Sequence, residues 1–211
     1  MIFIKKGNVP NIFSDTKRKY ENYDNLRESS KNVLKEYLIK EQGGLCAYCM
    51  TRINLNNSTI EHYIPRNGIN GDMSKSLDYD NLFAVCMNER NSGEKSRHCD
   101  VSKGDNLITI DPRKESDILQ IKYKRDGEIY SDNGDFENDL NNTLNLNVTT
   151  LRKNRRSALD SALKSMARIN KNTWKEEYVK KHLKALEQRA EKTEYIGIIV
   201  YELSKRLKRI D

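Results

Sequence analysis

The sequence predicts an α+β protein in which a mainly helical chain surrounds a small, loop-rich core. Apolar residues recur with helical spacing near both ends of the 211-residue chain. Residues 45–112 lack that spacing and are rich in Gly, Asn, Ser and Asp, and all four cysteines lie among them. We therefore expect an N-terminal extension and helix over residues 1–44, the core over 45–112, and a hairpin with basic helices over 113–211.

The first helix is predicted over residues 14–42. Ser14 or Asp15 can cap its N-terminus, because a short polar side chain accepts a hydrogen bond from the first helical amides. Gly43 and Gly44 should stop the helix, since glycine leaves the helical conformation readily.

Short extended segments are expected beyond this helix, at Thr59–Ile64 and Leu107–Ile110. Ile118–Tyr123 and Glu128–Tyr130 flank Arg125–Gly127, whose glycine suits a tight turn. These two segments are therefore predicted to pair as a hairpin.

Three helices are predicted after residue 137. The first carries an apolar stripe with i, i+3, i+4 spacing, made of Leu151, Ala158, Leu159, Ala162, Leu163 and Met166. The second contains Trp174, Tyr178, Leu183, Leu186 and Ala190, and the third spans Tyr195–Leu207. We interpret these stripes as buried core.

The distribution of charge favours a polyanionic partner. The net charge is +7 and the isoelectric point is about 9.1. Between Arg152 and Lys192 there are thirteen Lys and Arg residues against five Asp and Glu residues. Such a basic half suits a surface that follows phosphates, although a solvated helix face explains the run equally well. Arg152, Lys153, Arg155 and Arg156 are candidate nucleic-acid contacts.

No secretory signal or membrane span is expected. The opening MIFIKK has too short an apolar run before its lysines. The longest apolar stretch near the C-terminus, Ile196–Leu203, is interrupted by Glu202 and is too short to cross a bilayer. A cytoplasmic location without membrane contact is therefore predicted.

The cysteines predict a structural zinc site. Cys46 and Cys49 form a CxxC turn that lets two thiolates grip one tetrahedral ion, and Cys86 and Cys99 supply the other two ligands. A redox CxxC pair, the competing interpretation, would not need the second pair of cysteines. His98, next to Cys99, is an alternative fourth ligand. A closed site of four thiolates stabilises a fold and leaves no open position for chemistry.

A second chemical centre is predicted in the segment Ile60–Arg66, between the two cysteine pairs. Imidazole accepts a proton from water near neutral pH, which suits His62 to act as a general base. The carboxylate of Glu61 suits Mg²⁺, which prefers oxygen ligands. Neighbouring side chains on a strand point to opposite faces, so both serve one site only where the strand bends, and Pro65 favours a bend. Arg66 is a candidate nucleic-acid contact.

The order of these residues resembles that of the zinc-bearing HNH endonucleases. The match comprises Cys46-x2-Cys49, Glu61-His62-x2-Pro65, Asn81-Leu82, Cys86 and Cys99-Asp100-x2-Lys103. The resemblance implies a small ββα-metal core within the α+β chain. It also implies metal-dependent hydrolysis of the phosphodiester bonds of a nucleic acid, either DNA or RNA.

The resemblance further implies a role for each matching residue. His62 is the general base, and Asn81 anchors the loop that carries it. Glu61 and Asp100 hold the catalytic Mg²⁺ or Mn²⁺, and Lys103 lies near the phosphate. Asp100 departs from the family, in which His or Asn is usual, but a carboxylate is a sound ligand for a hard metal.

A narrower resemblance, over roughly residues 30–160, is to the HNH proteins of retron and Septu-type phage defence, the PtuB group. It rests on the long Cys86–Cys99 interval, on Asp111-Pro112 after a short strand, and on the run from Leu144 to Arg155. It implies a partner ATPase of the ABC/SMC-like PtuA type, with a retron reverse transcriptase and its DNA product as further candidates. The competing interpretation is a catalytically inactive, zinc-stabilised module that binds nucleic acid or serves as an adaptor.

Overall fold

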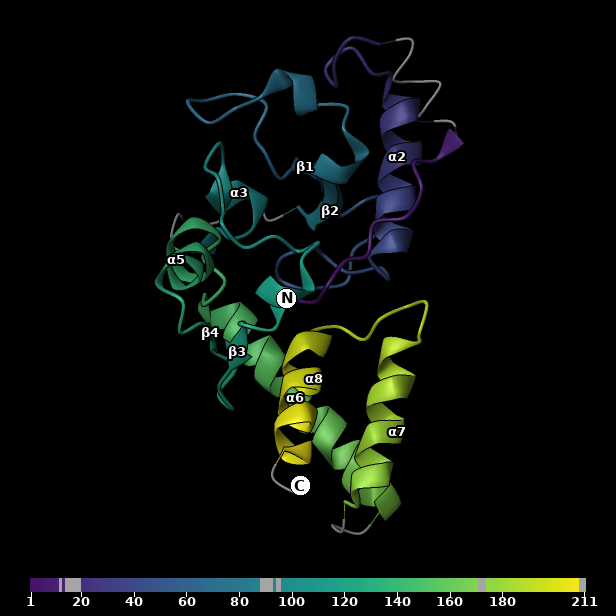
Figure 1. Cartoon of the computed structure of the whole chain (residues 1–211), viewed down its shortest axis with the longest axis vertical. Coiled ribbons are helices and arrows are strands. Elements are labelled where there is room, and N and C mark those ends of the chain that lie inside the picture. Colours follow the sequence, from purple (N-terminus) through teal and green to yellow (C-terminus); the bar gives the residue numbers. More distant parts are fainter. Residues whose placement is uncertain (12, 14–19, 88–92, 94–95, 171–173, 209–211) are drawn as a thin grey trace.

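The computed structural model describes residues 1–11, 13, 20–87, 93, 96–170 and 174–208. Helices and two small two-stranded sheets make up this structure, which confirms the α+β class. Helix α2 (Glu28–Glu41) and the first sheet lie at one end of the molecule (Figure 1). Helices α6 (Thr149–Asn170), α7 (Glu176–Glu187) and α8 (Ile196–Leu207) lie at the other end.

The first sheet pairs strand β1 (Ser58–His62) with strand β2 (Leu82–Cys86) in antiparallel register. Ser58 lies opposite Cys86, and His62 lies opposite Leu82. All five residues of β2 are buried. Helix α2 packs against this strand, and its own Leu34 and Leu38 are buried. The predicted extended segment near Thr59–Ile64 is confirmed, with a strand that ends at His62.

The second predicted extended segment, Leu107–Ile110, is not a strand. The carboxylate of Asp139 accepts hydrogen bonds from the amides of Thr109 and Ile110, at 2.6 and 3.0 Å. Asp139 begins a π-helical turn, Asp139–Thr143. A distant side chain therefore satisfies amides that a neighbouring strand would otherwise bind.

Helix α2 begins later than predicted. Residues 14–19, which include the proposed caps, lie outside the described residues. Residues 20–27 form bends and turns, and the Asn22 side chain accepts from the amides of Asp24 and Asn25, which draws the backbone away from a helix. The predicted end is confirmed, since Gly43 and Gly44 have positive φ angles of 67° and 76°.

The predicted hairpin is also confirmed, as strands β3 (Lys122–Tyr123) and β4 (Ile129–Tyr130). Gly127 in its turn has φ of 91°, and a Cβ there would clash with the Arg152 carbonyl. The remaining short elements are α3 (Asp100–Lys103), α4 (Glu115–Ile118), α5 (Gly134–Asn138) and the 3₁₀ turns Met73–Lys75 and Tyr79–Asn81.

Three C-terminal helices form where the apolar stripes predict them, but α7 leaves Trp174 and Ala190 outside its ends, and Ala190 is exposed. Leu151, Leu159 and Met166 of α6 are buried, and α8 packs against α6, α7 and β3. Among the described residues, none of the helices has the length and apolar character needed to cross a membrane.

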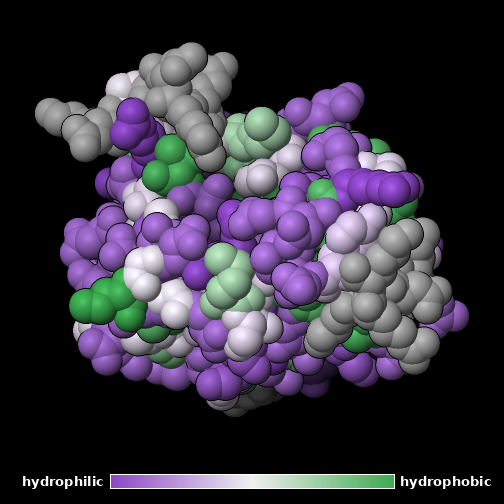
Figure 2. All heavy atoms as spheres, turned by 90° about the horizontal axis from the view of Figure 1, so that it is seen from above, coloured by the Kyte–Doolittle hydropathy of each residue, from purple (hydrophilic) through white to green (hydrophobic). Residues whose placement is uncertain are grey.

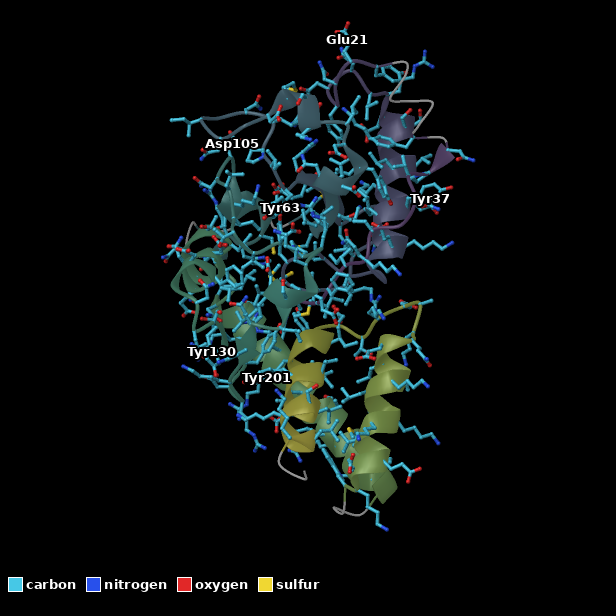
Figure 3. The ribbon with its side chains drawn as sticks, in the orientation of Figure 1. Glu21, Tyr37, Tyr63, Asp105, Tyr130 and Tyr201 are labelled. Carbon is cyan, nitrogen blue, oxygen red and sulfur yellow. The ribbon has the colours of Figure 1, made fainter. Side chains whose placement is uncertain are left out.

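The surface is largely polar. The face seen from above is mostly hydrophilic, with apolar residues scattered over it (Figure 2). Tyr37 points away from α2 and is 47% exposed, whereas Tyr63, in the half that contains the first sheet, is partly buried (Figure 3).

Candidate functional site

The four cysteines come together as predicted, and all are buried. Cys46 and Cys49 lie in the turn after α2, Cys86 ends β2, and Cys99 precedes α3. Their sulfur atoms all lie within 4.8 Å of one another. The Cys46–Cys99 and Cys49–Cys86 sulfurs are 3.9 and 3.7 Å apart. Tetrahedral zinc thiolates require an edge of about 3.8 Å, so the cluster could hold a metal ion such as zinc.

The charges within this cluster also suit a cation. Burial raises the pKa of Cys46, but hydrogen bonds from the other three thiols outweigh it and bring that pKa well below its ordinary value. The hydrogen bond with Cys46 raises the pKa of Cys86, and burial raises that of Cys99. Ionisation of one thiol therefore opposes ionisation of its neighbours, and a divalent ion would remove that opposition.

His98 lies at the edge of the cluster. Its Nδ1 is 3.1 Å from the Cys99 sulfur and 4.0 Å from the Cys86 sulfur. Because Cys99 is already one of the four gathered thiols, the geometry favours Cys99 over His98 as the fourth ligand.

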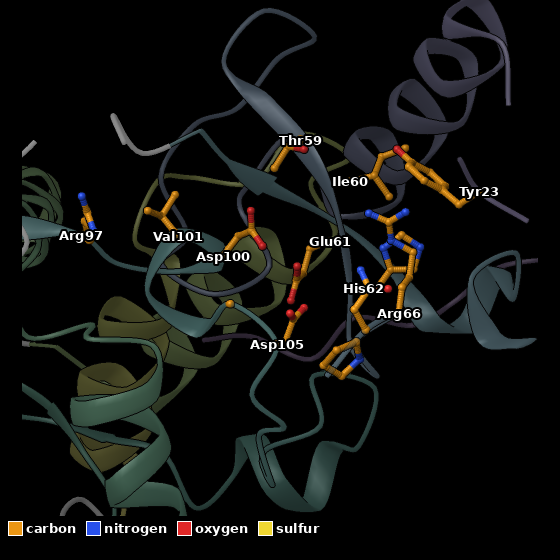
Figure 4. A pocket seen from close by; sticks show the side chains of 13 residues that line it. Tyr23, Thr59, Ile60, Glu61, His62, Arg66, Arg97, Asp100, Val101 and Asp105 are labelled. Carbon is orange, nitrogen blue, oxygen red and sulfur yellow. The ribbon is translucent and has the colours of Figure 1, made fainter. Parts of the chain in front are cut away.

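A cleft of about 530 Å³ opens beside the cluster. It is lined by β1, by the turn at residues 65–67, by α3 and by Tyr23 from the segment before α2. The carboxylates of Asp100 and Glu61 lie on one side of the cleft, and His62 lies with Arg66 and Tyr23 on the other (Figure 4). Glu61 and His62 both reach the cleft because it surrounds the end of the strand.

Glu61 is the most buried carboxylate of the cleft, at 5% exposure. Burial, with help from the hydrogen-bonded Asp100, raises the pKa of Glu61 to about 8, although Lys103 lowers it. The Lys103 ammonium lies 2.7 Å from Glu61 Oε1. Two carboxylates that meet in a buried site form a suitable pair of ligands for a hard divalent ion.

The His62 ring is held in one orientation. Its Nε2 lies 3.0 Å from the carbonyl oxygen of Ser76, and only a protonated Nε2 can donate to a carbonyl. Nδ1 is then left with a lone pair. The Tyr23 ring packs edge-on against the His62 ring, with the ring centroids 4.9 Å apart. Burial lowers the pKa of His62 to about 4, so the imidazole is neutral at pH 7 and able to accept a proton.

Asn81 ties the loop after β1 to the loop that contacts His62. Its Oδ1 accepts from the Ile64 amide at 2.7 Å, and its Nδ2 donates to the carbonyls of Ile64 and Lys75 at 3.0 and 3.2 Å. Lys75 is the neighbour of Ser76, whose carbonyl orients His62. The buried side-chain amide of Asn81 thus links the segment that follows His62 to the segment whose carbonyl accepts a hydrogen bond from the His62 ring.

Some of the residues predicted to contact nucleic acid lie at the surface, and others are buried. Arg66 lines the cleft, pairs with Asp24 and lies over the Tyr23 ring. Lys103 is fully buried beneath the cleft and also donates to the His62 carbonyl at 3.1 Å.

The four arginine and lysine candidates on α6 lie away from the cleft, whose described lining includes no residue of that helix. Lys153 and Arg156 are exposed, and Arg152 pairs with Asp126. Arg155 is fully buried and donates to the carbonyls of Gly127 and Leu146, at 2.6 and 2.8 Å. Contrary to the prediction, Arg155 is therefore not at the surface to contact nucleic acid.

Several residues of the site escaped the sequence analysis, among them Asp105, whose carboxylate also lines the cleft (Figure 4). Tyr23 and Ser76 contact His62 from segments that carry no motif. Tyr48 lies within the CxxC turn, and its hydroxyl donates to Glu61 Oε1 at 3.3 Å. Only the position of Tyr48 between two cysteines could have drawn attention to it.

The chain is similar to curated proteins that are named as HNH endonucleases of retrons. It is 26% identical over 135 residues to "Retron Vc95 putative HNH endonuclease" of Vibrio cholerae serotype O1 biovar El Tor, a match that covers 57% of this chain and 64% of that protein. It is 30% identical over 80 residues to "Retron Ec83 putative HNH endonuclease" of Escherichia coli, covering 34% and 31%. The chain thus spans less than two thirds of each relative. No protein-family model matches it.

Proposed function

We propose that this protein is a metal-dependent endonuclease of the HNH class that hydrolyses phosphodiester bonds in nucleic acid. The observation that carries the proposal is the cleft in which a neutral, oriented His62 faces the carboxylates of Glu61 and Asp100. Similarity to proteins named as retron HNH endonucleases supports the same class.

His62 is the general base in this proposal. Its Nδ1 takes a proton from a water molecule whose oxygen bonds to phosphorus, while the bond from phosphorus to the leaving sugar oxygen breaks. The leaving oxygen takes a proton from solvent. Ser76 keeps Nε2 protonated throughout, and Asn81 keeps the two loops in register.

Glu61 and Asp100 are the ligands for the catalytic metal. When bound there, Mg²⁺ or Mn²⁺ would supply the positive charge that stabilises the phosphoryl and leaving oxygens. Two carboxylates with the remaining positions left to water suit Mg²⁺, which keeps several waters in most proteins. The four cysteines hold zinc, which maintains the fold and takes no part in the reaction.

The substrate and partners follow from the charge and from the relatives. Arg66 at the cleft, and Arg152, Lys153 and Arg156 on α6, provide positive charge for flanking phosphates. The names of the relatives support a place in retron defence. An ATPase of the PtuA type, and a reverse transcriptase with its DNA product, are the proposed partners.

Cleavage of plasmid DNA and of total RNA with Mg²⁺ or Mn²⁺ tests this function. His62→Ala should abolish cleavage and leave the folded protein and its cysteine-bound metal intact, because His62 touches no thiol. His182→Ala is the matched control, since His182 lies on α7 against Tyr178 and outside the cleft lining.

Cleavage by the wild type and by His182→Ala, but not by His62→Ala, would support the proposal, and the polymer cut would name the substrate. Equal cleavage by all three proteins would refute the role of His62. If the wild type cuts nothing, even with the co-expressed ATPase, the inactive zinc-stabilised binding module is the better explanation.

A further inference from the structure

We propose that Tyr48 and Lys103 are positioning residues that hold Glu61 by one oxygen and thereby couple the cysteine cluster to the catalytic metal position. This inference rests on the proposed function, because it assigns Glu61 as a ligand of that metal. It gives Lys103 a role beneath the cleft in place of a contact with phosphate.

Both residues contact the same atom of Glu61. The Tyr48 hydroxyl donates to Oε1 at 3.3 Å, and the Lys103 ammonium lies 2.7 Å from Oε1. Because both contacts engage Oε1, we assign Oε2 to the metal. A metal ligand whose second oxygen is tied down needs little reorganisation when the ion binds.

Each contact comes from a segment that the cysteines hold. Tyr48 lies between Cys46 and Cys49, and it is fully buried. Lys103 is the last residue of the short helix that follows Cys99, and its amide donates to the Cys99 carbonyl at 2.8 Å. A metal ion that draws the cysteines together therefore sets the positions of both donors.

Lys103 is poorly placed to bind a phosphate. Its side chain is 1% exposed, and its ammonium is engaged by Glu61 and by the His62 carbonyl at 3.1 Å. The second contact joins the backbone of the proposed base to the proposed metal ligand. The buried ammonium of Lys103 thus fixes the spacing between Glu61 and the backbone of His62.

The chain contains a second set of residues with the same chemistry, which provides matched controls. Lys6 lies 2.8 Å from Glu41 and donates to the Leu82 carbonyl at 3.0 Å, and the Tyr79 hydroxyl donates to Glu41 at 3.3 Å. This Lys–Glu–Tyr set is also largely buried, but none of its members lines the cleft. Variants there disturb a similar network away from the proposed metal position.

The experiment measures Mn²⁺ binding to the zinc-loaded protein by electron paramagnetic resonance, together with zinc content. Lys103→Met should raise the Mn²⁺ dissociation constant about 10- to 100-fold, and Tyr48→Phe about threefold to tenfold, with one zinc retained per chain. Lys6→Met and Tyr79→Phe should leave the constant within about twofold of wild type. If Lys103→Met fails to retain zinc, Tyr48→Phe decides alone, since it removes a single oxygen atom.

Unchanged Mn²⁺ affinity in Tyr48→Phe and Lys103→Met would overturn the inference, and so would an equal loss in the control variants. Tighter binding in Lys103→Met would also overturn it, because Lys103 would then compete with the metal. A wild type with no Mn²⁺ site sensitive to Glu61→Gln refutes the inference directly. A wild type that binds Mn²⁺ but cuts no nucleic acid, even with the co-expressed ATPase, refutes the proposed function instead, and the binding comparison still decides the inference.

Discussion

The clamp formed by Asn81 offers a sharp test of how this fold holds its proposed base. Asn81→Ala removes three side-chain hydrogen bonds, to the amide and carbonyl of Ile64 and to the carbonyl of Lys75. Asn81 is 2% exposed, so water cannot easily replace them. At about 1 kcal/mol for each bond, the expected loss in the free energy of unfolding is about 3 kcal/mol.

Urea unfolding at constant zinc measures this loss, and the rate of cleavage measures its effect on His62. We expect the rate constant to fall about 100-fold, because a misplaced base is costly even when the group itself is present. Asn142→Ala is the matched control. Asn142 is exposed, and its side-chain amide donates to the Asn138 side chain at 2.8 Å in a contact at the exposed surface, so its loss should cost less than about 0.5 kcal/mol.

Asn81→Asp tests whether the two hydrogen bonds that the Asn81 side chain donates matter in addition to the one that it accepts. Its carboxylate can still accept from the Ile64 amide, but the second oxygen would face two carbonyls. It should therefore be at least as destabilising as Asn81→Ala at neutral pH. A loss below about 1 kcal/mol in Asn81→Ala, with a normal rate of cleavage, would refute the view that this side chain holds the loop.

Two further predictions concern the metal cluster and the buried arginine. Removal of zinc by a strong chelator should lower the melting temperature by at least about 10 °C and expose four reactive thiols, as measured by calorimetry and by thiol titration, whereas omission of Mg²⁺ should do neither. Unreactive thiols after complete chelation would contradict a shared metal. Arg155→Met should lower the free energy of unfolding by about 3 kcal/mol, because two buried carbonyls lose their donor, and the exposed neighbour Arg156→Met should cost less than about 0.5 kcal/mol in the same urea titration. Weaker nucleic-acid binding by Arg155→Met at full stability would instead restore the surface role.

Local patterns were sufficient for the regular parts of the fold. The glycines after α2, the turn at Gly127 and the apolar stripes of α6 to α8 act through backbone preference and helical spacing, which need no knowledge of distant partners. The cysteine cluster was predictable for a similar reason. Four thiols in one short window have few alternatives to a shared ion, so their types and spacing carry most of the information.

Elements that depend on a distant side chain were not predictable. Leu107–Ile110 has the composition of a strand, but Asp139 takes the amides that a strand would offer. The start of α2 was misplaced because the Asn22 turn competes locally with the helix. The Asp139 hydrogen bonds come from outside the predicted strand, and the Asn22 hydrogen bonds come from a polar side chain that the spacing of apolar residues does not take into account.

The cleft shows the same division. From residue types and order alone, His62, Glu61 and Asp100 could be named as candidates, because acid, base and metal chemistry belong to the side chains themselves. The chain's tertiary packing settled which cations face solvent and which are buried. Lys103 and Arg155 have long flexible side chains like their exposed neighbours. Lys103 is buried because it pairs with Glu61, and Arg155 is buried because it donates to the carbonyls of Gly127 and Leu146. Burial of a charge depends on partners brought together from distant segments, and no local pattern encodes those partners.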